Sequence, residues 1–499
     1  MKTAEEFRKE VYEKQSAAVA ARHKRNRRSA LCVSLALVVM VCGVGVPRLL
    51  SQKNNDALRP RLLQVGSPKN PVDLSSDEAV EQEFEDQMKA ETLKAEQEIR
   101  KLQNQAKFRQ EVLDQAAIEP WFSDGVNGLI DAAALNIAAG HENDCISPLS
   151  LYYDLALLSS GAEWETAEEL RSLLGVDAAK SLSLAEQCRH YYAQHYRSQM
   201  DSIFRLENSL WLDSAHTYSD AFIRSAEENF FASLFLVDFS DPTVADDMTN
   251  WVAEQTNGLL NPSFEFGKDH KASILNSLYY RNTWAAPFDP AKTETGKFTT
   301  SSGVVDAEFM HRTFTTDVYQ MRGDWKCFLI PLSDGDEMVI IFPDNSHAEV
   351  TMESVFGYSY WLDQYLEWQE YPDIYKTTAM VDLSIPKFTV KQEYDLIDML
   401  PSIARDEVLA DFGNMGNVEL FVSKLQHDVS FTIDENGVEA ASGTEIGLST
   451  TGVAPEETME INLNRPFAYA VLTNDKTTDP DATKKTVVYY GVCGDPTQN

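Results

Sequence analysis

The run Glu435–Thr451, ENGVEAASGTEIGLSTT, combines the composition of a loop with the alternation of a strand. Its small residues and its glycines, at positions 437, 443 and 447, favour an exposed connection. Every second residue from Val438 to Leu448 is nevertheless apolar, small or β-branched, and the residues between them are polar or tiny. A period of two predicts a strand with one buried face. The segment is therefore compatible with two conformations.

Strand-like sequence flanks this run, with Val429–Asp434 before it and Met459–Leu463 after it. A helix-like stretch, Val126–Ala139, opens a long globular region, in which helical and strand-rich blocks then alternate. Because these blocks lack regular βαβ repeats, we predict an α+β domain over residues 120–499.

Charge is distributed unevenly along the 499 residues, a length that allows two to four domains. The formal net charge is −35, and residues 1–61 carry +8 against −43 for the remainder. An acidic body argues against nucleic acid as a partner and against docking on anionic lipid.

Residues with catalytic or metal-binding chemistry form no recognisable motif. The sequence contains no Gly-x-Ser-x-Gly, no His-Glu-x-x-His and no phosphate-binding loop. The six cysteines, at 32, 42, 145, 188, 327 and 493, lack the spacing of a metal site or a disulfide framework. We expect no enzyme activity, no metal and no cofactor, and we interpret the four cysteines of the globular region mostly as packing residues with free thiols.

The N-terminal residues predict a membrane anchor. A basic segment, 1–29, precedes the uncharged run 30–46, which would reach about 25 Å as a helix. The basic flank places the N-terminus in the cytoplasm and the rest outside, as a single-pass signal-anchor. The alternative is a cleaved secretory signal, for which 28 residues is a long leader and Val44–Val46 a poor cleavage site.

Residues 47–119 are interpreted as a spacer followed by a helical stalk. Four prolines lie between 47 and 72, whereas 74–118 are rich in Glu, Gln and Ala without Gly or Pro. The heptads are too broken for a stable coiled coil, so they allow at most weak self-association.

Short motifs in a fixed order extend over the whole globular region. They are Ile146–Ser150, Ser160–Thr166, Leu173–Gly175, Asn208–Trp211, Asn250–Gly258, Asn276–Trp284, Ile385–Phe388, Glu435–Thr444, Asn464–Phe467 and Asp495–Thr497. In this order and spacing they resemble the serpin family of serine protease inhibitors. The resemblance implies the serpin fold, with a large central β-sheet, smaller sheets, about nine helices and an exposed reactive loop. With the anchor, it suggests a membrane-anchored, bacterial-type member.

The resemblance also implies three sets of residues that serve a sheet able to open. The hinge of the loop comprises Glu435, Gly437, Val438, Glu439, Ala440, Ala441, Ser442, Gly443 and Thr444. The shutter, a hydrogen-bond cluster beneath the central strands, comprises Ser147, Ser150, Asn276 and His427. The breach, where insertion starts, comprises Trp284, Lys387 and Glu435, the last two as an exposed ion pair that orients the hinge.

Two departures from the family pattern stand out. Asn282 occupies a position that is usually Gly, and Val438 one that is usually Thr or Ser. Counting seventeen residues from the start of the hinge places the scissile bond at Thr451-Gly452, whereas counting back from the next motif allows cuts nearer Val453 or Ala454.

The function implied is inhibition of a serine protease on the cell surface. The protease would cleave the loop, form an acyl-enzyme and be trapped as a covalent complex when the loop inserts as a strand. Because no Arg or Lys occurs between 435 and 463, elastase-like or subtilisin-like targets fit better than trypsin-like ones. The alternative is a non-inhibitory surface binding protein of the same fold, which the small hinge residues oppose.

Overall fold

The computed structural model describes residues 63–65, 117–137, 141–177, 179–180, 183–198, 202–321, 325–344, 349–357, 361–362, 365, 376–438, 458–479 and 484–498. All of them belong to one compact unit. The predicted segments 1–29 and 30–46, and nearly all of the predicted spacer and stalk, lie outside the described residues. None of the helices in the described part is long and apolar enough to cross a membrane.

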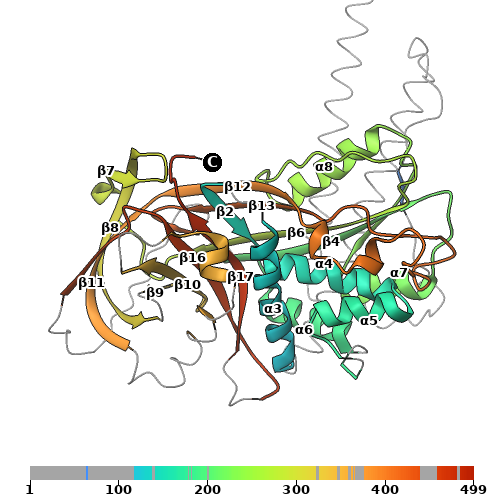
Figure 1. Ribbon diagram of the computed structural model, residues 1–499, viewed down its shortest axis with the longest axis horizontal. Helices are drawn as coiled ribbons and strands as arrows, with labels where there is room; N and C mark the ends of the chain where they lie inside the picture. Colours follow the sequence, from blue (N-terminus) through green and yellow to red (C-terminus); the bar gives the residue numbers. More distant parts are fainter. Residues whose placement is uncertain are drawn as a thin grey trace, which may run out of the picture. The chain divides into compact units, whose positions relative to one another are not determined.

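An eight-stranded sheet contains the strands on either side of the predicted hinge (Figure 1). Its order is β1 (Leu63–Val65), β5 (Ser233–Val237), β4 (Ser202–Asp213), β6 (Ala272–Thr283), β14 (Gly437–Val438), β13 (Gln426–Ile433) and β12 (Phe388–Asp395), with β3 (Arg197–Ser198) paired to β4. The edge strand β1 comes from the stretch interpreted as a spacer. Buried and less buried residues alternate along β13, as expected for a strand with one face on the core.

A nine-stranded sheet forms the second layer of strands. Its order is β15 (Thr458–Asn462), β11 (Lys376–Pro386), β8 (Val304–Gln320), β9 (Trp325–Pro331), β10 (Glu337–Pro343), β16 (Phe467–Asp475), β17 (Lys484–Cys493) and β2 (Asn143–Ile146), with β7 (Glu294–Thr299) paired to β8. Strands β16 and β17 are buried over almost their whole length. Their near-continuous apolar sequence is therefore explained by cover on both faces.

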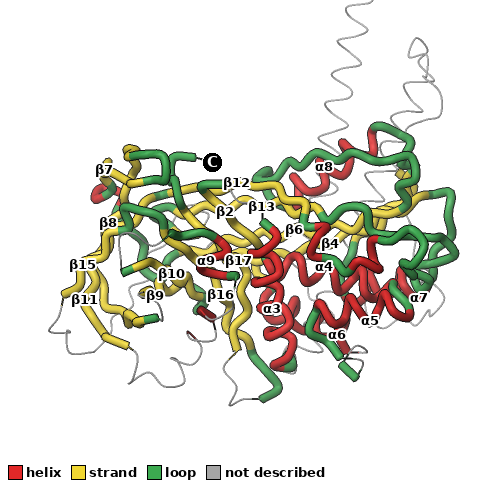
Figure 2. The backbone as a smooth tube through the Cα atoms, viewed as in Figure 1, coloured by secondary structure: helices red, strands yellow, loops and turns green. Residues whose placement is uncertain are grey.

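Seven α-helices lie within the described residues, compared with about nine expected from the resemblance. They are α3 (Pro120–Asn136), α4 (Pro148–Gly161), α5 (Trp164–Leu173), α6 (Leu184–His195), α7 (Asp220–Asn229), α8 (Thr243–Gln255) and α9 (Met352–Phe356). Figure 2 shows α3 to α7 grouped together beside the strands. Helix α3 begins six residues before the predicted start because Pro120 occupies its first position, where a missing N–H costs nothing.

The predicted α+β class is confirmed by these sheets and helices. The prediction for the cysteines is also confirmed, since Cys145, Cys188, Cys327 and Cys493 are all buried and unpaired. Burial raises the pKa of each of these thiols, so they pack as apolar side chains.

Candidate functional site

The first residues of the predicted loop form a strand in the middle of the eight-stranded sheet. Val438 pairs with Ile433 of β13 on one side and with Asn282 of β6 on the other, antiparallel to both. A tight turn over 434–436 reverses the chain, closed by a 3.0 Å hydrogen bond from the Asp434 N–H to the Gly437 carbonyl. The chain therefore leaves β13, turns, and begins to run back between β13 and β6.

Strand β14 separates two strands that run parallel to each other. Within the described residues no ladder joins β6 directly to β13, and β14 is the link between them. Gly437 is needed here because a Cβ atom would lie 2.1 Å from the Asn282 carbonyl oxygen. The side chain of Val438 is buried and belongs to the hydrophobic core, on the same face as Ile433. A strand continuing from β14 would therefore place every second side chain against the core.

Trp284, predicted to mark the breach, holds the backbone of this turn. Its indole N–H donates to the Asp434 carbonyl at 2.8 Å, and its backbone N–H donates to the Asn436 carbonyl at 2.8 Å. The Phe288 N–H donates to the Glu435 carbonyl at 2.9 Å, and the two aromatic rings pack edge to face. Trp284 is 2% exposed, so its hydrogen bonds form where water is excluded.

The predicted pair of Lys387 and Glu435 is present, but it is less exposed than the sequence suggested. The Lys387 Nζ lies 3.2 Å from Glu435 Oε1 and 2.8 Å from Glu308 Oε2, and the Glu435 side chain is only 13% exposed. The Thr293 hydroxyl also donates to Glu435, at 2.8 Å. Burial alone would raise the pKa of Glu435, but hydrogen bonds from its own backbone N–H, Thr293 and Lys387 hold the pKa below its usual value. The side chain of the first hinge residue is thus held by two other residues, Lys387 and Thr293.

The four residues predicted for the shutter lie in one hydrogen-bond chain. The Ser147 backbone N–H donates to His427 Nε2 at 3.1 Å, and the Ser147 hydroxyl oxygen caps α4 by accepting from the Ser150 N–H at 3.2 Å. The Ser150 hydroxyl donates to Asn276 Oδ1. Since His427 lies on β13 and Asn276 on β6, the N-terminus of α4 bridges the two strands that β14 separates.

Sequence reasoning missed a fifth member of this cluster. Asn208 of β4 accepts a 2.8 Å hydrogen bond from Asn276 and donates to the Phe230 carbonyl at 2.7 Å. It is buried and pairs directly with Asn276 across the sheet. Asn208 is the first residue of the motif Asn208–Trp211, so the sequence did mark this position. Its role nevertheless depends on the β4–β6 register, which the sequence does not reveal.

Replacing His427 with glutamine is expected to change the pH dependence of stability. Burial lowers the pKa of His427 to about 4, from 6.5 in an unfolded chain. The neutral ring therefore favours the fold above about pH 6.5, and this contribution, at most about 3 kcal/mol, is lost as the pH falls through about 4. In denaturant unfolding, the free-energy difference between parent and variant should shrink from pH 7 to pH 4. A difference that stays constant would contradict the assignment.

Asp428, the next residue of β13, is expected to act in the opposite direction. Burial raises the pKa of its carboxyl to about 6, from 3.8 in an unfolded chain, and the Glu393 charge adds to this effect. Its stabilising contribution is therefore present below about pH 4 and lost as the pH rises through about 6. Asp428→Asn should increase the free energy of unfolding at pH 7, by at most about 3 kcal/mol, and much less at pH 4. Equal effects at both pH values would exclude titration of this group as the cause.

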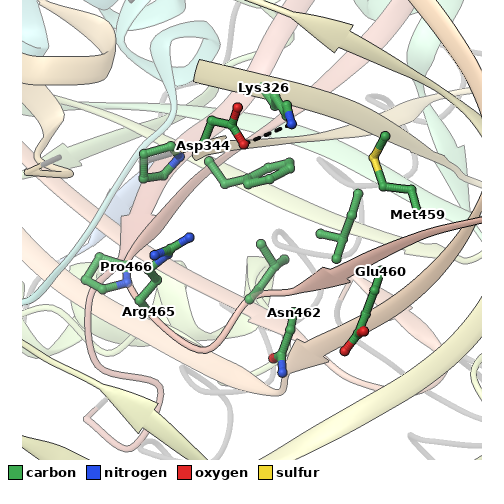
Figure 3. Close-up of a pocket in the computed structure, with 11 residues that line it drawn as sticks. Lys326, Asp344, Met459, Glu460, Asn462, Arg465 and Pro466 are labelled. Carbon is green, nitrogen blue, oxygen red and sulfur yellow. Dashed lines mark hydrogen bonds and ion pairs between the residues drawn. The ribbon is translucent and has the colours of Figure 1, made fainter. Parts of the chain in front are cut away.

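A pocket beside β15, the strand that follows the predicted loop, is a poor alternative site. Its volume is about 210 Å³, and Figure 3 shows Arg465 at the left of the pocket and the ion pair of Lys326 with Asp344 at the top. Pockets that enclose small ligands usually measure about 300–1,000 Å³. Its charged groups of both signs also define no single ligand chemistry.

The remaining predicted site residues lie outside the described residues. These are the hinge positions Glu439, Ala440, Ala441, Ser442, Gly443 and Thr444, and the scissile positions Thr451 and Gly452. Their roles stay predictions.

Comparison with known proteins establishes the family. The family described as "Serpin (serine protease inhibitor)" matches residues 131–479, and the chain belongs to it. It is 25% identical to a "Serine protease inhibitor" of Cyanea capillata, over 73% of this chain and 95% of that protein. It is 26% identical to neuroserpin of Mus musculus, over 66% of this chain and 82% of that protein. Among solved structures, thyroxine-binding globulin in complex with thyroxine matches with a TM-score of 0.63 and 21% identity, over 75% of this chain and 99% of that one, which shows a shared fold.

Proposed function

We propose that the protein inhibits serine proteases by accepting its own cleaved loop as a new strand of the eight-stranded sheet. The observation that carries this proposal is β14, the two-residue strand that already lies between β6 and β13. Within the described part of the chain those strands are joined only through β14, so a strand that continues β14 would pair with both of them. The protein acts as a stoichiometric trap and not as a catalyst.

The register of β14 supports insertion of small residues. Continued from Val438, the pairing would set Ala440 between Phe431 of β13 and Tyr280 of β6, both buried on the core side. Alanine fits between two large rings, whereas a long or charged side chain would not. The hinge sequence is therefore matched to the strands that would receive it.

The same register brings the inserted strand onto the shutter. Thr444 would stand opposite His427 on one side and Asn276 on the other. A threonine hydroxyl can both donate and accept a hydrogen bond, so it can join that polar cluster without leaving a buried group unpaired. We infer that the shutter residues exchange partners when the strand enters.

The protease class follows from the loop sequence. The residues around the proposed Thr451-Gly452 bond are small and uncharged, which favours elastase-like or subtilisin-like enzymes. Incubation of the protein with elastase, subtilisin and trypsin, followed by denaturing electrophoresis, tests the function. A covalent complex with the first two supports it. Cleavage without any complex would favour the non-inhibitory alternative.

We also propose that the inhibitor is displayed on a cell surface, a bacterial one in the sequence-based interpretation. The basic segment before the apolar run 30–46 supports an N-in orientation. Protease added to intact cells should then remove the globular domain and leave the N-terminus protected. A mature protein whose N-terminus lies just after Val46 would show instead that the segment is a cleaved secretory signal and that the domain is secreted.

A further inference from the structure

The turn between β9 and β10 carries an ion-pair cluster that contacts β6, one of the two strands paired with β14. Arg197, at the start of β3, lies 2.9 Å from Asp334 Oδ2 and 2.5 Å from Asp336 Oδ2. The side chains are 20%, 15% and 4% exposed, respectively. The Tyr280 hydroxyl donates to Asp336 at 3.1 Å. Two acidic residues of the β9–β10 turn thus meet a cation and a hydroxyl of the eight-stranded sheet.

Asn282 connects this cluster to the end of β6. Its side-chain NH₂ donates to Asp334 Oδ1 at 2.6 Å, and its Oδ1 accepts from the Ser333 hydroxyl at 3.0 Å. The Ser333 N–H donates to the Thr283 carbonyl at 2.9 Å, and the Ser202 hydroxyl of β4 donates to Asp334 at 2.6 Å. The ends of β4 and β6 are therefore bound to one turn of the other sheet.

The backbone of Asn282 is at the same time the partner of Val438. This residue is fully buried, and its side-chain amide is bonded to Tyr280, Asp334 and Ser333. The glycine that serpins usually have here could make none of the side-chain bonds. Asparagine in place of the usual glycine at position 282 thus adds a contact between β6, the neighbour of β14, and the β9–β10 turn.

The cluster is built to resist movement. Burial alone would lower the pKa of Arg197, but the charges of Asp336 and Asp334 outweigh it and raise the pKa, so the guanidinium stays charged. Separating Arg197 from the buried Asp336 would leave a buried charge without its partner, which is unfavourable. The end of β6 is consequently held where these bonds are satisfied.

We propose that Asn282, Asp334 and Arg197 act as a clamp that holds the end of β6 at the distance from β13 that admits the loop. The clamp thereby sets how fast the loop inserts, and so what share of the cleaved molecules trap the protease. They are positioning residues that touch neither the protease nor the scissile bond. This inference rests on the proposed function.

Asn282→Gly tests the clamp, because it removes the side chain and leaves a residue that this fold commonly has there. We expect the number of inhibitor molecules consumed per trapped protease to rise about threefold or more, since bonds that hold β6 are lost. The rate of loop cleavage should stay unchanged. Ser333→Ala, a surface change that removes one bond to Asn282, should act in the same direction but less.

Tyr365→Phe is the matched control, since it removes a part-buried hydrogen bond to Glu337 of β10 and changes no residue of β6. It should leave the stoichiometry at the parental value.

A second assay needs no protease: uptake of a synthetic peptide with the sequence of residues 438–448 should be slower in Asn282→Gly than in the parent. If the parent traps no protease, the proposed function fails and the peptide assay alone decides the clamp. If Asn282→Gly consumes as many inhibitor molecules per trapped protease as the parent, and takes up the peptide as fast, the clamp proposal is wrong.

Discussion

Replacing Ala440 with arginine is expected to convert the inhibitor into a substrate. If the loop inserts in the register set by Val438 and Ile433, residue 440 would lie between Phe431 and Tyr280, which are both buried. A charged side chain there would be unpaired and desolvated, at a cost of several kcal/mol, on the order of 3–5. Because each ~1.4 kcal/mol changes a rate about tenfold, insertion would become slower than deacylation.

The measurement for Ala440→Arg is the partition between covalent complex and cleaved inhibitor. Cleavage should occur at the parental bond and rate, with complex reduced about tenfold or more. Ala441→Arg is the matched control, because residue 441 would fall on the opposite face, beside the half-exposed Ser430 of β13. It should be much milder. Equal inhibition by both variants and the parent would exclude insertion in this register.

Replacing Thr451 with arginine is expected to redirect the inhibitor to trypsin-like enzymes. Trypsin recognises the residue before the scissile bond through a buried carboxylate, so it accepts a cation and rejects a small neutral side chain. The rate of complex formation should rise about 100-fold or more with trypsin and fall with elastase. Both rates come from progress curves of residual protease activity.

Val453→Arg distinguishes cleavage after Thr451 from cleavage after Val453, and unlike an arginine at 454 it does not precede Pro455, which would block trypsin. If cleavage follows Thr451, arginine at 453 should leave trypsin inhibition weak. The C-terminal peptide released from the Thr451→Arg variant, identified by mass spectrometry, should then begin at Gly452. Strong trypsin inhibition by Val453→Arg alone would move the scissile bond to the C-terminal side of Val453.

Much of the site was predictable because its residues occur in short, ordered motifs. Ser147, Ser150, Asn276 and His427 could be grouped without coordinates, and the structure places them in one hydrogen-bond chain. Alternation along the hinge also predicted a strand, of which Gly437 and Val438 form the described start.

Other features depend on contacts that a single sequence cannot show. Asn282, Asp334 and Arg197 are far apart in the chain, and only the sheet register and the β9–β10 turn bring them together. Glu435 accepts a hydrogen bond from Thr293, which no motif contained. Continuous apolar runs such as β16 and β17 do not distinguish a buried strand from a buried helix by periodicity.

The most direct test of strand insertion is the thermal stability of the protein before and after loop cleavage. A protease that cuts between Ser449 and Ala454 without being trapped would provide the cleaved form. The inserted strand adds roughly ten ladder hydrogen bonds, each contributing ~0.5–1.5 kcal/mol. We therefore expect the melting temperature to rise by about 10 °C or more on cleavage. A cleaved protein that melts at or below the temperature of the intact one would contradict insertion of the loop into the sheet.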